Sequence, residues 1–509
     1  MKKFRFFVYL LPLLCVFILS MKPQAATNGY YTYTVMNDEA IITDVNSSIK
    51  GAITIPEQLG GYPVTTIDQN AFEGCFQLTS VTSNDGLRYI NANAFYRCES
   101  LSSVSLPNTI EVIGQGAFDG CKKLKFSEYG NGMYLGNTEN PYLVLISATN
   151  QDITSFSIHQ NTKLIATKAF WDCNKLTTAT IGGNVQYIGP NAFSSCDGLT
   201  SVTIGGSVQK ISAEAFTYCR GLLLITIEEG VQTIDAGAFA YCDTLASVSI
   251  PDSLRSLGDA VFAKCPALRY KTYSNAYYLG NTNNPYLILI RSTSKSITSC
   301  TIHQNTKFIY EGAFEECSKL KSVTLSKTLL EVGNRAFRAS GLISVTFPCG
   351  VVKDRTFAEC TALKNVTLLD GVHTIEAEAF TQCIFNEIKI PSSMKQIEMY
   401  AFCEINLTDV YYNGSRAQWD QFDVAVELQK YWMPAVTIHC AEDIAEPGDL
   451  NNIAGVDEYD AIYLLQHVLM PTYFQITQDA DFDKNGVVSE NDAIYLLQHV
   501  LMPDSFPLA

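Results

Sequence analysis

Charged residues are scarce in this chain of 509 residues, at 17%, and they are mostly acidic: 35 Lys and Arg against 51 Asp and Glu give a net charge of -16 at pH 7. Nucleic-acid binding needs clustered Lys and Arg, so no such partner is expected. Neither HExxH nor GxSxG occurs, and no isolated carboxylate pair is evident, so catalysis by the chain itself is not expected. After residue 19 no run is apolar and long enough to span a bilayer.

The N-terminal residues have the pattern of an export signal. Lys2, Lys3 and Arg5 precede an apolar run over residues 6–19, and small residues for cleavage end at Ala26. We therefore expect residues 1–26 to be a signal peptide and the mature chain to be secreted and extracellular, without a transmembrane anchor.

Most of the chain follows one internal period. An Ala-Phe pair, occasionally varied, recurs mostly every 23 residues, with Ile, Leu or Val five residues before each Phe and usually Cys three residues after it. A unit this short cannot enclose a core alone, so its apolar positions must pack on those of the next unit. The thirteen phenylalanines that mark the units are Phe72, Phe95, Phe118, Phe170, Phe193, Phe216, Phe239, Phe262, Phe314, Phe337, Phe357, Phe380 and Phe402.

Within a unit, apolar and polar residues alternate over short stretches between turn residues, which favours short strands. The stretch SVSLPNTIEVIGQGAFDGCKKL over residues 103–124 resembles the BspA-like class of leucine-rich repeat. The resemblance implies a mainly β leucine-rich repeat solenoid with short strands in each coil, often found in cell-surface adhesins.

Two units are stretched to 52 residues and match each other at an offset of 144 residues, as in YLGNTENPYLVLI and YLGNTNNPYLILI. We expect a hairpin insertion in each, near residues 126–157 and 270–301. Tyr134, Tyr142, Tyr278 and Tyr286 are candidate exposed aromatics that would stack on sugar rings or on a partner protein. The favoured alternative is that they cover the hairpin against the solenoid. His159 and His303 are expected to be turn residues and not a catalytic pair.

Eleven of the 16 cysteines occupy one position of the repeat, three residues after the Phe in almost every unit. In an exported chain, cysteines first suggest disulfides. One thiol per coil at one position is better explained as a buried ladder, because free cysteine behaves as a small apolar residue.

We expect an N-terminal cap over residues 27–66, repeats over 67–403, a C-terminal cap over 404–440, a linker over 441–447 and a separate module over 448–509. Trp419 and Trp432 are expected to pack inside the C-terminal cap.

The module contains the string DAIYLLQHVLMP twice, at residues 460–471 and 492–503, each after a loop of oxygen-bearing residues. The second loop has the ligand spacing of an EF-hand calcium loop, with a glycine at position 6 and a backbone carbonyl at position 7. Its expected ligands are Asp481, Asp483, Asn485, Val487, Ser489 and Asp492.

The first loop is poorer, since Ile453 replaces a ligand and Ala454 replaces the glycine. It is expected to bind Ca²⁺ more weakly than the second loop. Its expected ligands are Asp449, Asn451, Gly455, Asp457 and Asp460. Behind each loop the apolar residues recur every three and four positions, which predicts two amphipathic helices that bury their stripes on each other. The stripes include Leu464 and Leu465 in the first copy and Leu496 and Leu497 in the second.

The segment resembles a type I-like dockerin, a small all-α calcium-binding domain of two EF-hand-like loop-helix units. Dockerins attach secreted proteins to cohesins on cellulosome scaffoldins. The resemblance implies a cohesin partner and either-way binding through two nearly identical faces. The residues that it implies for cohesin binding are Glu458, Tyr459, Gln466, His467, Glu490, Asn491, Gln498 and His499.

Three functions are compatible with these features. The first is a non-catalytic protein that holds a protein or carbohydrate on its repeats and is tethered to a cohesin. The second is a BspA-like cell-surface adhesin in which calcium only stabilises the module. The third is a dockerin-borne polysaccharide-degrading hydrolase or a peptidase, for which the sequence offers no catalytic constellation.

Overall fold

The computed structural model describes residues 25–420, 423–424, 436–441, 461, 464–465, 480, 482 and 488–501. The chain divides into two compact units, one of Met1–Leu199 with Ser207–Arg220 and one of Thr200–Gly206 with Gly221–Ala509. Each unit consists of stacked coils, and most coils contribute one strand to a long-strand ladder and one two-residue strand to a short-strand ladder. Both ladders are parallel, as the repeat period predicts.

The first unit begins with three antiparallel strands, in the segment expected to form the N-terminal cap, and the last of them, β3, pairs in parallel with β6. Its first sheet contains β1 (Ala26–Asn28), β2 (Tyr31–Met36), β3 (Glu39–Val45), β5 (Gln58–Leu59), β6 (Tyr62–Ile67), β8 (Tyr89–Ile90) and β10 (Val112–Ile113). The neighbouring long-strand ladder contains β4 (Gly51–Thr54), β7 (Leu78–Thr82) and β9 (Ser103–Ser105). The remaining strands of this unit are β11 (Ser127–Tyr129), β12 (Gly132–Leu135), β13 (Val144–Ala148), β14 (Leu164–Ile165), β15 (Thr178–Ile181), β16 (Tyr187–Ile188) and β18 (Lys210–Ile211).

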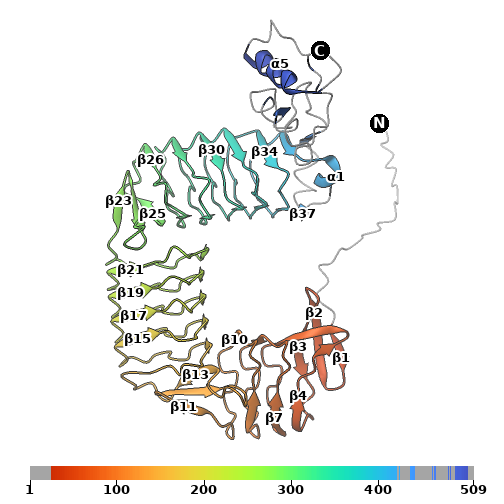
Figure 1. Ribbon diagram of the computed structural model, residues 1–509, viewed down its shortest axis with the longest axis vertical. Helices are drawn as coiled ribbons and strands as arrows, with labels where there is room; N and C mark the ends of the chain where they lie inside the picture. The colour runs from red at the N-terminus through yellow and green to blue at the C-terminus, as the bar shows by residue number, and fades with distance from the viewer. Residues whose placement is uncertain are drawn as a thin grey trace, which may run out of the picture. The chain divides into compact units, whose positions relative to one another are not determined.

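The second unit repeats this plan, and Figure 1 shows its strands β17, β19 and β21 side by side. Its long strands are β17 (Ser201–Ile204), β19 (Leu224–Ile227), β21 (Ser247–Ser249), β26 (Ser299–Thr301), β28 (Ser322–Thr324), β30 (Ser344–Phe347), β32 (Asn365–Leu368), β34 (Glu387–Pro391), β36 (Asp409–Asn413) and β38 (Thr437–Cys440). Its short strands are β20 (Thr233–Ile234), β22 (Ser256–Leu257), β27 (Phe308–Ile309), β29 (Glu331–Val332), β31 (Val351–Val352), β33 (Thr374–Ile375), β35 (Gln396–Ile397) and β37 (Asp423–Val424). The hairpin strands β23 (Lys271–Tyr273), β24 (Ala276–Leu279) and β25 (Ile288–Ser292) and the helices α1 (Arg416–Trp419) and α5 (Glu490–Leu501) complete it.

The residues expected to seal the C-terminal end of the coils continue both ladders. β36 pairs in parallel with β34 and β38 with β36, while β37 pairs with β35. Trp419 is 4% exposed and meets Tyr412 edge-on at 5.3 Å between ring centroids, so its predicted packing role is confirmed. Trp432 lies outside the described residues.

The repeated phenylalanines form the spine of each core. Along a strand, alternate residues face opposite sides, and the inward ones are apolar, as in β15 with its exposed-buried-exposed-buried order. The Phe rings of neighbouring coils stack, with centroids 4.8 Å apart for Phe170 and Phe193 and 5.4 Å for Phe337 and Phe357. The buried ladder that the Ala-Phe period predicts is therefore present in both units.

The predicted thiol ladder is also present. None of the fifteen cysteines from Cys75 to Cys440 forms a disulfide, and all but Cys403 are buried. In several coils the thiol donates a hydrogen bond to the Phe carbonyl oxygen of the preceding coil. The distance is 3.1 Å from Cys98 Sγ to Phe72 O and 3.1 Å from Cys383 Sγ to Phe357 O. The thiol thus fills a small apolar site and donates a weak hydrogen bond.

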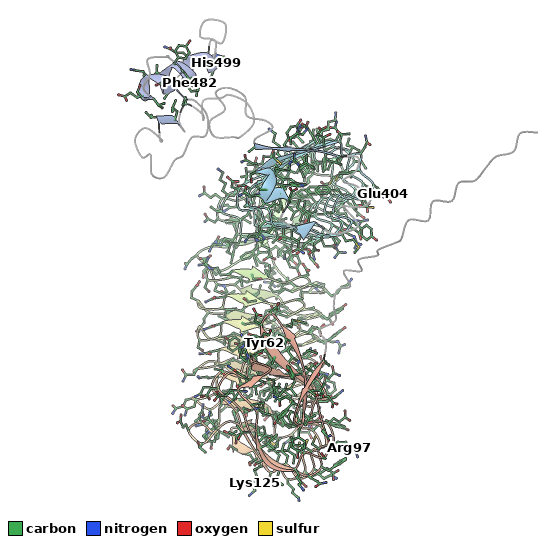
Figure 2. All side chains as sticks on the ribbon, turned by 90° about the vertical axis from the view of Figure 1, so that its right-hand side faces the viewer. Tyr62, Arg97, Lys125, Glu404, Phe482 and His499 are labelled. Atoms are coloured by element: carbon green, nitrogen blue, oxygen red, sulfur yellow. The ribbon has the colours of Figure 1, made fainter. Side chains whose placement is uncertain are left out.

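In the turn around each Phe, two residues have a left-handed backbone conformation that the sequence pattern does not predict. The residues two before and two after every one of the thirteen phenylalanines have positive φ, and many are not glycine, such as Ala260 (φ 55°) and Tyr218 (φ 60°). Figure 2 labels two of them, Arg97 and Glu404, which are exposed. A non-glycine residue in this conformation costs roughly 1–2 kcal/mol, so the coils hold strain that their inter-coil hydrogen bonds must offset.

Replacing Ala260 with glycine is expected to stabilise the second unit by about 0.5–1 kcal/mol, because glycine adopts positive φ without the clash of Cβ. The matched control is Ala263→Gly in the same turn, where φ is not positive and the flexible glycine should destabilise by a similar amount. Denaturant midpoints of the two variants should therefore move in opposite directions. Midpoints that fall in both variants would show that the turn holds no such strain.

Candidate functional site

The predicted calcium site lies largely outside the described residues. Of the residues expected to bind Ca²⁺ in the second loop, Ser489 and Asp492 are described, at the start of α5. The remaining residues of both predicted calcium loops lie outside the described residues: Asp481, Asp483, Asn485 and Val487 of the second loop and Asp449, Asn451, Gly455, Asp457 and Asp460 of the first. The same holds for four residues of the predicted cohesin face, Glu458, Tyr459, Gln466 and His467. Among the residues that are described, no three His, Cys, Asp or Glu side chains are grouped so that they could hold a metal ion.

The described end of this loop is a helix cap. The Asp492 carboxylate is fully buried, and its Oδ2 accepts hydrogen bonds from the Ser489 N–H at 2.8 Å and the Ser489 hydroxyl at 3.3 Å. An acid three residues into a helix that reaches back to the first backbone N–H forms half of a capping box. Loop positions 9 and 12 are thus held together at the start of α5, which coincides with the helix predicted for the second copy.

Residues from both copies of the repeated string share one small core. Ala461 and Leu464 of the first copy are buried with Ala493 and Leu496 of the second, together with Ala480, and Phe482 packs against them. Figure 2 labels Phe482 and, on α5, His499. Ala461 and Ala493 are the same position in the two copies, and so are Leu464 and Leu496. The apolar faces of the two copies therefore pack on each other, as the amphipathic pattern predicts.

Part of the predicted apolar stripe is not in this core. Leu465 and Leu497, again equivalent in the two copies, are 39% and 38% exposed. The prediction that both were buried is wrong, because an apolar side chain next to Leu464 or Leu496 in sequence points 100° around the helix axis from it. Of the predicted cohesin-binding residues on α5, Glu490 and Asn491 are exposed, and Gln498 and His499 are half-buried.

Each hairpin insertion is present as predicted and joins the short-strand ladder through its last strand. β11, β12 and β13 are antiparallel, and β13 then pairs in parallel with β14. β23, β24, β25 and β27 repeat this arrangement. The insertion thus replaces the short strand of one coil by a three-stranded meander.

The hairpin tyrosines divide into buried and surface residues. Tyr134 and Tyr278, offered as exposed aromatics, are fully buried, so that interpretation is wrong for them and the covering role is confirmed. The Tyr134 hydroxyl donates to Ser157 O at 3.3 Å, and burial raises the pKa of this phenol. Tyr142 and Tyr286 are half-buried.

Next to each buried tyrosine lies a cluster of two tyrosines and one histidine. Tyr142 stacks on His159 with centroids 4.0 Å apart, and Tyr129 meets both rings edge-on at 6.2 and 5.1 Å. Tyr286, His303 and Tyr273 repeat this geometry, with the stack again at 4.0 Å.

Tyr129 and Tyr273, which are 45% and 39% exposed, were not among the residues predicted from the sequence. The same 144-residue offset that relates the two hairpins also relates these two tyrosines. It would have singled them out.

Both histidines also act as turn residues, as predicted. The Asn161 N–H donates to His159 Nδ1 at 3.2 Å, and Asn305 does the same to His303. In both turns Nδ1 is therefore the acceptor of a backbone N–H.

A polar groove lies beside the second of these clusters. Its lining is made of amides, one carboxylate and one ammonium, from Asp252, Asn283, Asn284, Gln304, Asn305, Lys307 and Thr328. Asn284 Nδ2 donates to Asp252 Oδ1 at 3.0 Å, and Lys307 Nζ donates to Asp252 O at 2.8 Å. Amides and aromatic rings side by side suit hydroxyl-rich or peptide ligands.

Burial controls the chemistry of the thiols. It raises the pKa of Cys173 and of Cys349 to about 12 and that of Cys360 to about 11. These groups remain protonated at neutral pH and are poor nucleophiles, because the thiolate is the reactive form.

The free energy of unfolding is expected to fall as pH rises from about 9 toward 12. In this window the exposed thiols of the unfolded chain ionise while the buried thiols stay protonated, so the unfolded state binds fewer protons. Each such thiol contributes a slope of about 1.4 kcal/mol per pH unit, and the stabilisation is complete below pH 9. Denaturant unfolding in reductant across this range measures it. Cys173→Ala should reduce the slope, and an equal slope in that variant would contradict the assignment.

Within the described part of the chain, no helix combines the length and the apolar character that crossing a bilayer requires.

Short parallel coils that stack their inward leucine, isoleucine and phenylalanine side chains define the leucine-rich repeat class of solenoid. The family profile described as "BspA type Leucine rich repeat region (6 copies)" matches residues 46–135, 148–269 and 292–409, well over half of the chain. The chain belongs to the BspA-type leucine-rich repeat family. The unmatched stretch 136–147 contains most of β13, and the unmatched stretch 270–291 contains β23, β24 and most of β25.

Solved structures of bacterial repeat proteins are similar to this chain. A leucine rich cell surface protein from Faecalibacterium prausnitzii is 28% identical, with 79% of this chain and 98% of that one covered and a TM-score of 0.29. A leucine-rich repeat protein from Bacteroides ovatus is 21% identical, with 82% and 99% covered and a TM-score of 0.28. The pneumococcal vaccine antigen PcpA is 14% identical, with 82% and 98% covered and a TM-score of 0.23. No curated protein matches the chain significantly.

Proposed function

We propose that this chain is a secreted, non-catalytic binding protein with two binding parts. Its repeats hold a protein or carbohydrate, and its C-terminal module binds Ca²⁺ and attaches to a cohesin of a cellulosome scaffoldin. The observation that carries the second part is the shared core of Ala461, Leu464, Ala493 and Leu496. Two loop-helix units that pack equivalent residues on each other, behind loops with EF-hand spacing, are what a dockerin-like module requires.

The exposed residues of α5 support a protein interface there. Leu497 is 38% exposed, with the predicted contact residues Gln498 and His499 next to it in sequence. An apolar centre with a polar rim is the usual composition of such a surface. Leu465 is exposed at the equivalent position of the first copy, so both copies present the same apolar residue.

The aromatic-histidine clusters and the polar groove beside the second one support ligand binding by the repeats. Exposed tyrosines supply large, rigid contact area for a sugar ring or for a partner side chain. Membership of the BspA-type family also favours a second candidate, a cell-surface adhesin that needs no cohesin.

Capture of cohesins by the full chain tests the proposal. We expect at least one of a panel of cohesins to be retained in Ca²⁺ and released by a chelator. Changing Gln498 and His499 to alanine should leave capture intact, because the first copy has the same residues. Changing Gln466 and His467 as well should abolish it. No retention of any cohesin in Ca²⁺, together with binding of a cell or matrix protein, would favour the adhesin.

A further inference from the structure

The first hairpin interrupts the backbone hydrogen bonds between two coils of the first unit. In regular coils three N–H groups around the Phe donate to the next coil, as Asn93, Phe95 and Arg97 do at 2.9, 2.8 and 2.7 Å. The equivalent donors of the following coil are Gly116, Phe118 and Gly120. Their N–H groups have no partner among the described residues. The acceptor expected for the Phe118 N–H, Ala169 O, receives the Ala148 N–H of β13 instead, at 2.7 Å.

A cleft lies along these open donors. Its apolar lining consists of Phe118, Phe126, Ile146, Ala166 and Trp171. Trp171 is 43% exposed. In the arrangement of Figure 1, this is where β10 ends one short-strand ladder and β13 begins the next. The cleft therefore combines an apolar wall with a row of unpaired backbone N–H groups.

The second hairpin produces the same interruption, but there the chain fills it. The Phe262 N–H, equivalent to that of Phe118, donates to the Tyr310 hydroxyl at 3.0 Å. The Ala260 N–H, equivalent to that of Gly116, lies near the Glu311 carboxylate and lowers its pKa, although burial raises that pKa more strongly. Tyr310 is only 9% exposed, so its ring occupies the interior of this second break.

The first break lacks each of the groups that fill the second. At an offset of 144 residues, Ala166 and Thr167 stand in place of Tyr310 and Glu311, and Ser147 stands in place of Arg291. In the second break the Arg291 guanidinium lies 5.7 and 5.1 Å from the ring centroids of Tyr270 and Tyr277. In the first break these smaller side chains leave an open cleft, whose lining includes Ala166, Thr167 and Ser147.

The charges of the first cleft favour an anion. Lys122 and Lys168 belong to its lining, while the second break has Pro266 and Gly312 at these positions. Lys168 Nζ lies 5.3 Å from the Trp171 ring centroid, and Lys122 pairs with Glu99 at 2.8 Å on the surface. Asp119 is the one carboxylate among the residues described as lining the cleft.

We propose that this cleft binds a tyrosine followed by an acidic residue, in an extended segment of a protein partner. The ring enters the space beside Ala166, its hydroxyl accepts the Phe118 N–H, and the acidic side chain accepts the Gly116 N–H near Lys168. The chain itself supplies the template for this ligand, because in the second break the Tyr310 hydroxyl accepts the Phe262 N–H and the Glu311 carboxylate lies near the Ala260 N–H. This cleft would be a site for the protein binding proposed above for the repeats, and it rests on that proposal. It involves neither calcium nor cohesin.

The probe is a blocked peptide with the sequence of residues 306–312, TKFIYEG, titrated into the full chain in the presence of a chelator. Calorimetry should give one site per chain, with a change in Trp171 fluorescence that Trp171→Phe removes. Replacing the tyrosine of the peptide by alanine should weaken binding at least tenfold. Absence of binding by TKFIYEG, or equal binding of the two peptides, would overturn the proposal.

Two reciprocal variants locate the site. Ala166→Tyr with Thr167→Glu should fill the first cleft and weaken peptide binding at least tenfold, while its circular dichroism and its cohesin capture stay as in the unchanged chain. Tyr310→Ala with Glu311→Thr should open the second break and raise the stoichiometry from one to two. Unchanged binding in the first variant would place the peptide elsewhere and overturn the proposal even if the second variant fails to fold. Because cohesin capture is measured on the same samples, failure of the peptide site leaves the cohesin proposal untouched.

Discussion

Phe193→Ala lowers the free energy of unfolding by about 3–5 kcal/mol, the usual cost of removing a buried phenylalanine. Phe193 is fully buried between Phe170 and Phe216, with ring centroids 4.8 and 5.0 Å away and interplanar angles of 10° and 2°. The cavity left by alanine cannot collapse easily, because the coils above and below are fixed by parallel ladders. The stack on both sides also loses its ring contacts.

Denaturant unfolding followed by circular dichroism measures this loss. Phe76→Ala is the matched control, since Phe76 is 55% exposed and its removal should change stability by less than about 0.5 kcal/mol. Phe193→Leu should fall between the two, because it keeps most of the apolar volume but not the ring stacking. If Phe193→Ala unfolds at the same denaturant concentration as Phe76→Ala, the phenylalanine ladder does not hold the coils together.

The core could be predicted because every coil repeats the same packing problem. An apolar residue five positions before the Phe, the Phe itself and the Cys three positions after it meet their counterparts in the next coil, so one period fixes all of them. Phe95, Cys98 and Leu101 are each fully buried, as their repeat positions require. The hairpins were visible for the same reason, since the chain contains each of them twice.

The strained turns could not be predicted, because the residues there do not share a chemical type. Asn and Gly at several of these positions are typical of positive φ, but Lys264 and Tyr218 are not. At most of these positions the backbone N–H donates to the next coil, as in the Tyr241 N–H to Ala263 O contact at 2.8 Å, so the conformation is set by contacts between coils. The side chains are then free to vary on the surface.

The surface features depended on contacts that a linear pattern does not contain. Tyr134 and Tyr129 are five residues apart on two paired strands, yet one is fully buried and the other is 45% exposed. Likewise, the exchange of Tyr310 for Ala166 is visible in the aligned halves of the sequence. That both residues face an interrupted ladder follows only from the hydrogen bonds of β13 and β25.

Asp481→Ala together with Asp492→Ala is expected to remove the calcium response of the C-terminal module and its capture by cohesin. Asp481 and Asp492 are the first and twelfth positions of the stronger loop, so the change removes two carboxylates from one Ca²⁺ ligand set. Asp492 is in addition fully buried and accepts the Ser489 N–H at the start of α5. Loss of this cap alone costs about 1 kcal/mol of helix stability.

Calcium titration followed by circular dichroism, with capture measured on the same protein, separates these two effects. The unchanged chain should gain helicity as Ca²⁺ is added, and the double variant should not. Asp504→Ala is the control for the single changes, because it removes one carboxylate three residues after Leu501 in sequence and outside the loop. A variant with Asp481→Ala alone keeps the Asp492 cap and should still lose most of the response, since the ion and not the cap orders the loop. Full capture by the double variant without any gain of helicity would refute the metal-dependent attachment, whereas full capture together with an unchanged gain of helicity would place the ion in the first loop.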